Sequence, residues 1–204
     1  MILGRVPADR DELRRRYAAP AADWVRVNLV VSLDGSAAGP DGTSRSLTTG
    51  ADRRVLGAIR AESDLVLVGA ATLRAEPELV PRVTPLAVLS RSGDTGAARL
   101  RPGDVVLDRL PELGGRIVCE GGPSVVAQLL DAGLIDEICL TTVPRMVGGV
   151  AVAPFGGAVT PSLELQQLLV DDAGVSYARL LCVPRGASSA ASQSRIAPSQ
   201  RSGS

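Results

Sequence analysis

Four short segments carry residues that could do chemistry, and each directly follows an apolar run. They are Ser32-Leu33-Asp34-Gly35, Val68-Gly69-Ala70-Ala71-Thr72, Ser90-Arg91-Ser92-Gly93 and Cys119-Glu120-Gly121-Gly122-Pro123. The apolar runs predict β-strands, so each segment begins where a strand ends. In a parallel sheet the carboxyl ends of the strands share one edge, where α/β proteins bind ligands. We therefore expect the four segments to face one site.

Two of these segments favour a phosphate-bearing ligand. Gly121 and Gly122 allow close approach to the backbone, and the start of the helix that follows presents N–H groups to an anion. Ser90 beside Arg91 suits a phosphate monoester. Taken singly, each segment is also explained as a tight turn or a polar surface loop. Their combination is what favours a nucleotide site.

Two of the strand ends carry a carboxylate that is expected to point toward the crevice, Asp34 and Glu120. The chain contains neither His nor Lys, and its 22 basic residues are all Arg. This composition excludes Ser-His-Asp and Cys-His nucleophiles, histidine-bound metals and Schiff-base lysines. Acid–base catalysis would therefore use carboxylates, water, Tyr or Cys. A protein with this composition fits a reaction in which a bound cofactor supplies the reactive group.

The composition indicates a single globular domain that does not bind nucleic acid or membranes. The chain has 204 residues, 45% of them hydrophobic, and 22 acidic residues balance 22 basic ones. A net charge of zero argues against nucleic-acid binding. No apolar run is long enough to span a membrane, and the N-terminus does not resemble a signal peptide, so we expect a cytoplasmic protein. Cys119, Cys139 and Cys182 lie in apolar runs without a CxxC pair, which predicts buried thiols and no metal site.

Strand and helix signals alternate along the chain. A capped helix is expected over 7–18, with Asp9 and Glu12 at its start, and further helices over 49–60, capped by Thr49, and 123–132. Strands are expected at 24–33, 64–69, 85–90, 104–107, 116–119, 136–143 and 175–183. This order predicts an α/β fold with a central, mainly parallel sheet, an antiparallel edge and helices on both faces. We expect one domain over 1–185 and a disordered tail over 186–204.

The motifs, in their order, resemble a known family. The segments are VNLVVSLDG, DGTSRSLTTGADRR, VLVGAATLRAEP, SRSG and IVCEGGPSVVAQLLDAGLIDEICLTTVPRMVGG. Over residues 24–183 the chain resembles the pyrimidine reductase of bacterial riboflavin biosynthesis, which has a dihydrofolate-reductase-like fold. The resemblance implies NADPH-dependent reduction of the ribosylamino group of 5-amino-6-(5-phosphoribosylamino)uracil to a ribitylamino group.

The resemblance also implies roles for individual residues. Cofactor-binding positions would be Val30, Ser46, Gly69, Thr72, Glu76, Ser90, Arg91, Gly121, Gly122, Pro123, Ser124 and Val125, with Ser90 and Arg91 at the 2′-phosphate. Substrate-binding positions would be Asn28, Ser44, Arg60, Arg82 and Glu120. The proton would come from Asp34 or Glu120, or from a water that they hold.

Two departures from the family pattern keep other functions open. Asn28 and Ser46 stand where the family usually has Lys and Trp. A dihydrofolate- or pterin-type reductase on the same fold is therefore the second interpretation, and a non-catalytic nucleotide-binding paralogue is the third.

Two structural expectations also follow from the resemblance. We expect a homodimer, because the family pairs subunits through the far edge of the sheet, here 138–143 and 175–183, and an apolar edge is a hazard in a monomer. We also expect a strained peptide, in the cis form, between Gly121 and Gly122.

Overall fold

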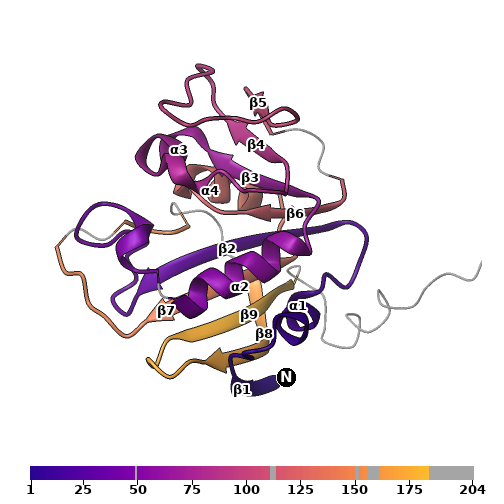
Figure 1. The fold of residues 1–204 in the computed structure, drawn as a ribbon, viewed down its shortest axis with the longest axis vertical. Coiled ribbons are helices and arrows are strands. Elements are labelled where there is room, and N and C mark those ends of the chain that lie inside the picture. The colour runs from indigo at the N-terminus through magenta and orange to yellow at the C-terminus, as the bar shows by residue number, and fades with distance from the viewer. Residues whose placement is uncertain (49, 111–113, 150–151, 156–160, 184–204) are drawn as a thin grey trace, which may run out of the picture.

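A nine-stranded sheet runs through the described part of the protein, with helices on both of its faces (Figure 1). The structure, a computed structural model, describes residues 1–183 apart from 49, 111–113, 150–151 and 156–160. The strands are β1 (Ile2–Arg5), β2 (Trp24–Ser32), β3 (Leu65–Gly69), β4 (Leu86–Leu89), β5 (Val105–Leu107), β6 (Arg116–Cys119), β7 (Glu137–Val143), β8 (Ser162–Val170) and β9 (Ser176–Val183). The helices are α1 (Arg10–Tyr17), α2 (Gly50–Ala61), α3 (Ala70–Ala75) and α4 (Pro123–Asp131), with the 3-10 turns η1 (Ser44–Ser46) and η2 (Pro77–Leu79).

The sheet confirms the predicted fold class. Its order is β1-β8-β9-β7-β2-β6-β3-β4-β5. All pairings from β7 through β5 are parallel, whereas β9 runs antiparallel to both β7 and β8. The four predicted strand-end segments therefore do follow parallel strands, β2, β3, β4 and β6.

Two apolar clusters hold the layers together, one on each face of the sheet. On one face, α1, α2 and α3 bury side chains such as Leu13, Ile59 and Leu73. On the other face, α4 buries Val126 and Leu129. Successive residues of a strand point to opposite faces, so a strand covered on both sides needs a continuous apolar run. This requirement explains why β3 reads Leu-Val-Leu-Val-Gly.

Register places the end of β2 far beyond the end of its neighbour β6 and level with the end of its other neighbour, β7. Val27 of β2 pairs with Cys119, the last residue of β6. β2 then continues through Ser32, which pairs with Val143 of β7. At roughly 3.3 Å per residue, the end of β2 lies about 16 Å past the end of β6. Strands β2, β3, β4 and β6 therefore end on the same side of the sheet, but β2 extends further along the strand direction than β6.

The structure differs from the prediction in three elements that were not predicted and in the position of the sheet edge. The sequence analysis missed β1, β8 and the short helix α3. β8 was missed because its polar residues mask its pattern; Gln167 is nevertheless 1% exposed, and the register shifts between Leu165 and Gln167. The stretches 138–143 and 175–183 are consequently interior strands, since β8 and β1 lie outside them.

The predicted start of α1 is confirmed, whereas the predicted cap of α2 is not tested. The N–H of Glu12 donates to the Asp9 carboxylate at 2.7 Å, which confirms the α1 cap. The Glu12 carboxylate itself accepts from Arg16. The proposed cap Thr49 and the expected tail, 186–204, lie outside the described residues.

A buried ionic cluster joins α1 to the amino ends of β2 and β7. Arg26 is 2% exposed and its Nε donates to Glu137 Oε2 at 2.7 Å, while the Arg179 Nε donates to Glu137 Oε1. Arg26 and Arg179 also donate to the carbonyls of Tyr17 and Arg16, the last two residues of α1. Buried charges need such partners, so this cluster fixes where α1 ends on the sheet. It lies at the opposite end of the sheet from the predicted site.

None of the helices in the described residues is both long and apolar enough to span a bilayer.

Candidate functional site

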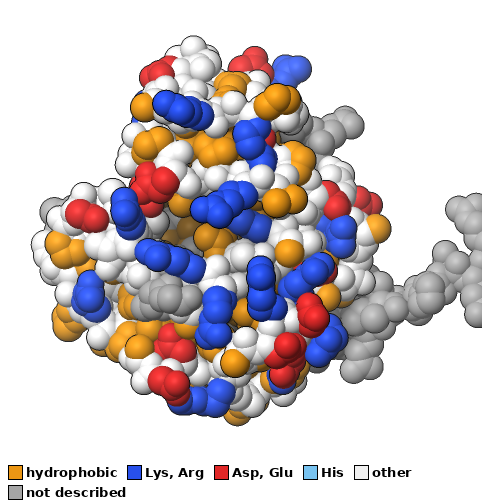
Figure 2. Space-filling view, in the orientation of Figure 1, with side chains coloured by type: hydrophobic (Ala, Val, Ile, Leu, Met, Phe, Trp, Pro, Cys, Tyr) orange, Lys and Arg blue, Asp and Glu red, His pale blue; other side chains and the backbone are white. Residues whose placement is uncertain are grey.

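A cavity of about 810 Å³ opens at the carboxyl side of the parallel strands. Its walls are α2, the central part of β2, α3, the β6–α4 turn and both 3-10 turns. This volume lies in the range of small-molecule and cofactor sites. Figure 2 shows arginine side chains gathered around a hollow on the face that α2 crosses. The arginines that line the cavity are Arg45, Arg53, Arg60 and Arg82.

The structure brings most of the predicted site residues into this cavity. Those that line it are Asn28, Val30, Ser44, Arg60, Thr72, Glu76, Arg82, Glu120, Gly121, Gly122 and Pro123. Those that do not are Asp34, Ser46, Gly69, Ser90, Arg91, Ser124 and Val125.

The two glycines after β6 allow three elements to meet closely. Gly121 has a φ of +101°, which other residues rarely adopt, and its carbonyl accepts the N–H of Gly69 at 3.0 Å. The Gly122 N–H donates to Thr72 Oγ1 at 3.0 Å. A side chain at Gly69 would meet Val125 at 3.0 Å, so Gly69 and Val125 pack β3 against α4 below the cavity.

The peptide between Gly121 and Gly122 is trans, so the cis expectation was wrong. The positive φ of Gly121 already turns the chain from β6 into α4. A trans bond is therefore sufficient to point the start of α4 at the cavity.

Arg60 and Glu120 form a bidentate ion pair on the cavity wall. The Arg60 Nε donates to Glu120 Oε1 at 2.6 Å and its Nη2 donates to Glu120 Oε2 at 2.5 Å. Arg60 Nη2 also donates to the Leu79 carbonyl at 2.9 Å. Burial lowers the pKa of Arg60, but the hydrogen bonds and charge of Glu120 outweigh this and raise it. The pair joins α2, the turn after β6 and η2.

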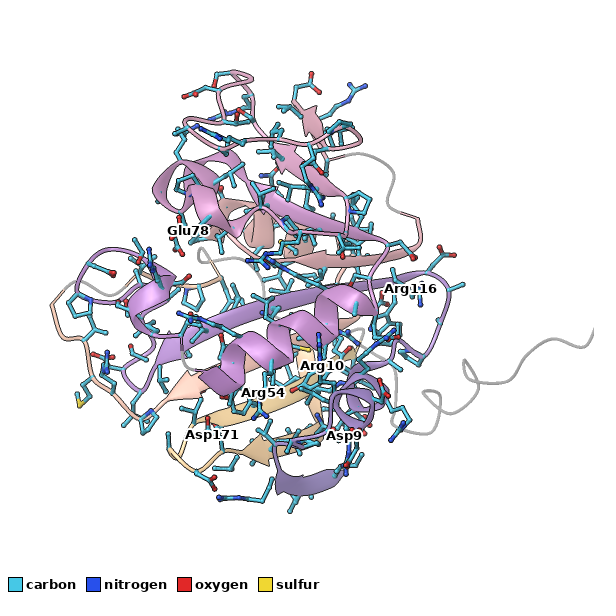
Figure 3. All side chains as sticks on the ribbon, in the orientation of Figure 1. Asp9, Arg10, Arg54, Glu78, Arg116 and Asp171 are labelled. Atoms are coloured by element: carbon cyan, nitrogen blue, oxygen red, sulfur yellow. The ribbon has the colours of Figure 1, made fainter. Side chains whose placement is uncertain are left out.

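Glu76 holds the 3-10 turn η1 against the site. Its side chain is buried, and its two oxygens accept the backbone N–H of Ser44 at 2.8 Å and the Ser44 hydroxyl at 3.0 Å. At the rim beside it, Glu78 pairs with Arg45 at 3.2 Å and is exposed (Figure 3). Ser46 donates to the Asp41 carboxylate at 2.7 Å, away from the cavity lining.

Asp34 lies away from the cavity because β2 extends so far. Its carboxylate accepts the Ser32 hydroxyl and the backbone N–H groups of Val147 and Gly148. The Ser32 hydroxyl and these N–H groups lower the pKa of Asp34 to about 2. Asp34 therefore anchors the loop after β7 as an ion.

Asp52 is a cavity carboxylate that the sequence analysis did not select. It lies in the first turn of α2, is 7% exposed, and accepts the Thr141 hydroxyl at 2.9 Å. Burial raises the pKa of Asp52, against the opposing effects of Thr141 and Arg53. The sequence contained a signal for it: Asp52 shares the inner face of α2 with Val55, Leu56 and Ile59 at helical spacing. A carboxylate on an otherwise apolar helix face is unusual, so this spacing could have marked Asp52 as a candidate site residue.

Comparison with known proteins identifies the family. The family model described as RibD C-terminal domain matches residues 23–177. This chain belongs to the RibD C-terminal domain family. The resemblance stated from the sequence motifs is thereby confirmed.

Curated relatives of this RibD C-terminal domain chain include the riboflavin biosynthesis protein RibD of Mycobacterium tuberculosis H37Rv. It is 28% identical over 184 residues, which cover 80% of this chain and 49% of the relative. The chain thus spans about half the length of the curated relatives it matches.

Solved structures share the fold. A pyrimidine reductase-like protein from Corynebacterium diphtheriae matches with a TM-score of 0.65 at 21% identity, over 79% of this chain and 92% of that one. RibD from Acinetobacter baumannii matches with a TM-score of 0.65 at 21% identity, over 79% of this chain and 58% of that one. A dihydrofolate reductase from Enterococcus faecalis, complexed with NADP(H), matches with a TM-score of 0.51 at 13% identity, over 78% and 96% of the two chains. The predicted dihydrofolate-reductase-like fold is confirmed.

The contact between Gly122 and Thr72 yields a stability prediction. A Cβ at position 122 would lie 2.8 Å from Thr72 Oγ1, a short side chain on α3 that cannot swing far. We expect Gly122→Ala to lower the free energy of unfolding by about 1–3 kcal/mol, the usual cost of overpacking. In a Thr72→Ala background the added cost should fall toward zero, which urea denaturation of the four proteins would measure.

Gly57→Ala is the matched control. Gly57 lies within α2 with open space around its Cα, so alanine there should stabilise the protein by about 0.4–1 kcal/mol. An equal cost of Gly122→Ala with and without Thr72 would contradict the proposed contact.

Proposed function

We propose that the protein is an NADPH-dependent reductase that converts the ribosylamino group of 5-amino-6-(5-phosphoribosylamino)uracil into a ribitylamino group. The observation that carries the proposal is the cavity itself. It combines a glycine-lined helix start, which suits a dinucleotide, with an arginine rim, which suits a phosphorylated substrate. Membership of the RibD C-terminal domain family supports the same reaction. Such a reaction belongs in the cytoplasm, where phosphorylated precursors and NADPH occur.

The residues at the β6–α4 turn fit a dinucleotide cofactor. α4 begins immediately after Gly121 and Gly122, and Pro123 at its first position leaves the start of the helix facing the cavity. The Gly122 N–H donates to Thr72 Oγ1, the Val125 and Val126 N–H groups donate to the Gly122 carbonyl, and Pro123 has no N–H. A phosphate would therefore meet the Ser124 N–H and the positive end of the helix dipole, without the lysine or histidine that this chain lacks. Thr72, Glu76 and Val30 line the same cavity, and Ser124 and Val125 follow in the first turn of α4. When bound, NADPH would supply the hydride.

The arginine rim favours a phosphorylated substrate over a pterin. Arg60 is engaged by Glu120, so it positions the wall and is not the first choice for a phosphate. Arg82 and Arg53 are exposed and line the cavity, and the described residues show no ion pair for either. We therefore assign the sugar phosphate to Arg82 and Arg53, with Asn28 and Ser44 nearer the pyrimidine.

The direct test compares substrates. NADPH oxidation should be measured with the phosphoribosylaminopyrimidine and with dihydrofolate side by side. We expect turnover with the pyrimidine and little with dihydrofolate. Turnover of dihydrofolate instead would support a pterin-type reductase, and NADPH binding without turnover of either would support a non-catalytic paralogue.

Cofactor choice gives a second test. Arg91 follows β4, is exposed, and succeeds Ser90, whose hydroxyl donates to the Asp94 carbonyl at 3.1 Å. We propose that Arg91 contacts the 2′-phosphate of NADPH. A hydrogen bond to a charged group contributes about 1.5–3 kcal/mol, so Arg91→Ala should weaken NADPH binding roughly 10- to 100-fold and leave NADH binding unchanged.

Fluorescence titration with both cofactors would measure this effect. Arg10→Ala is the control, because Arg10 is exposed at the start of α1, far from β4 (Figure 3). Equal losses for NADH and NADPH in Arg91→Ala would show that Arg91 does not recognise the 2′-phosphate.

We also propose a homodimer formed through the β7–β9–β8 part of the sheet. Leu140, Leu180 and Cys182 are only partly buried there, and Leu163 is 46% exposed. The helix described on this face is α4, which packs mainly on β3. We expect an interface above about 1,000 Å², and sedimentation should give twice the chain mass at micromolar concentration. A monomer under those conditions would rule the dimer out.

A further inference from the structure

We propose that Ser36 and Asp34 are positioning residues that hold the wall of the cavity against which the nicotinamide half of the cofactor packs. The inference rests on the proposed function. Neither side chain lines the cavity. Both act through the backbone segments that they hold together, the loop after β2 and the loop after β7.

Segment 36–38 lies along the edge of β2 beyond the point where β6 ends. The pairing of β6 with β2 reaches Val27. The Ser32 N–H donates to the Ser36 carbonyl at 2.9 Å, whereas the next N–H, that of Leu33, donates to the loop after β7 at 2.8 Å. Successive N–H groups of a strand point to opposite edges, so Ser36 is on the edge that faces away from β7.

Between these two contacts the edge of β2 borders the cavity. Residues 28–31 separate the last β6 partner from the next contact, which is about 13 Å of strand. Asn28, Leu29 and Val30 all line the cavity, although successive side chains of a strand point to opposite faces. Three consecutive lining residues indicate that the strand edge itself is open to the cavity. The β6–α4 turn and segment 37–38 are therefore the two ends of this open edge.

The wall at the second of these ends is apolar. We call it the apolar wall, and it consists of Val30, Ala37, Ala38, Val152 and Pro154, all of which line the cavity. A pyrimidinedione has several hydrogen-bonding groups, which these side chains would leave without partners. The dihydropyridine ring of NADPH has one carboxamide, and an apolar wall beside it would exclude water from hydride transfer. The chemistry of the wall therefore favours the nicotinamide half over the pyrimidine.

Ser36 joins the two loops that form the apolar wall. Its hydroxyl oxygen accepts the Val152 N–H at 3.2 Å, and its hydroxyl donates to the Ala38 carbonyl at 2.8 Å. The Ala37 N–H donates to the Val152 carbonyl at 2.9 Å. Ser36 is 2% exposed, so water cannot readily replace the bonds of its hydroxyl. One buried hydroxyl thus sets the spacing of the loops after β2 and β7, which run side by side in Figure 1.

Asp34 holds the same two loops from outside the cavity. Its carboxylate accepts the N–H groups of Val147 at 3.1 Å and Gly148 at 2.8 Å. It also accepts the Ser32 hydroxyl, whose oxygen accepts the Ser36 N–H at 3.0 Å. Ser32 is buried, so hydrogen bonds connect Asp34 to Ser36 through the interior of the loop. We assign Asp34 to this role rather than to proton donation.

Ser36→Ala tests the wall, because it removes the hydroxyl and keeps the Cβ. We expect NADPH to bind roughly three- to tenfold more weakly, the effect of one lost hydrogen bond. Adenosine 2′,5′-bisphosphate has the phosphorylated adenosine of NADPH but no nicotinamide, so its affinity should stay within about twofold of the wild type. Isothermal titration calorimetry would measure both ligands. A hydroxyl that merely stabilised the fold would not change the ratio of the two affinities.

A double-mutant cycle asks whether Ser36 acts through the wall. Val152→Ala should itself weaken NADPH binding, because it removes part of the apolar wall. If Ser36 positions Val152, Ser36→Ala should cost less NADPH affinity in the Val152→Ala background than in the wild type. Strictly additive losses would overturn the positioning role.

Amide hydrogen exchange tests the network without any ligand. We expect the Val152 amide to exchange about threefold faster or more in Ser36→Ala, because its acceptor is lost. The Val147 and Gly148 amides should respond in the same way to Asp34→Ala. Wild-type exchange rates at these amides would show that the two side chains do not hold the loops.

Two matched controls lie outside the cavity lining. The Ser63 hydroxyl donates to the Ile59 carbonyl at 2.8 Å, so Ser63→Ala removes a comparable bond just after α2. Asp171 at the β8–β9 turn (Figure 3) accepts the N–H groups of Ala173 at 2.9 Å and Val175 at 3.0 Å, as Asp34 does for its loop. Neither Ser63→Ala nor Asp171→Ala should change the affinity for NADPH or for adenosine 2′,5′-bisphosphate.

The outcomes separate this inference from the proposed function. If the wild type binds NADPH and Ser36→Ala weakens both ligands equally, or neither, the apolar wall does not hold the nicotinamide half. A raised KM for the pyrimidine with unchanged NADPH affinity would also overturn the assignment, because the wall would then hold the substrate. If the wild type does not bind NADPH, the proposed function fails, and the exchange rates still decide whether Ser36 and Asp34 hold the loops.

Discussion

The ion pair between Arg60 and Glu120 is the interaction on which the cavity depends. Arg60 comes from the end of α2, Glu120 from the end of β6, and the Leu79 carbonyl that also accepts from Arg60 lies in η2. One guanidinium therefore joins three elements whose separation defines the space between them. Removing one partner of such a part-buried pair would leave the other charge uncompensated, which costs far more than the pair contributes. The ion pair thereby fixes the positions of α2, the turn after β6 and η2 relative to one another.

The sheet supplies the second constraint. Parallel strands must end on the same side, and the short turns after β3 and β6 bring α3 and α4 against each other through Thr72 and Gly122. At the opposite end, the buried cluster of Arg26, Glu137 and Arg179 holds α1 in place. Polar chemistry is thus concentrated at both ends of the strands, while the middle of the sheet is apolar on both faces.

The fold places four carboxylates, in or near the cavity, in different surroundings. Glu120 is paired with an arginine, Glu76 caps backbone and hydroxyl donors, and Asp34 holds a loop. Asp52 is buried against a hydroxyl. Environments that push carboxylates toward different protonation states are what an acid–base site needs.

The sequence by itself determined much of this protein. Continuous apolar runs predicted β2, β3, β4, β6 and β7, and the glycines, hydroxyls and arginines after them predicted a nucleotide-type site. Those features are local, since strand propensity and turn chemistry depend on neighbouring residues. Local patterns also explain the misses: β8 contains Glu164, Gln166 and Gln167, which hide its pairing with β9.

Only the tertiary structure decided where each carboxylate lies and which groups surround it. Asp34 and Glu120 were the natural choices from strand ends, but the register carries β2 past β6 and so takes Asp34 away from the cavity. Arg60, sixty positions before Glu120 in the chain, engages that carboxylate in an ion pair. Asp52 meets Thr141 across 89 positions. The protonation of a carboxyl group depends on burial and on partners brought from distant parts of the chain, and neither is encoded in the residues beside it.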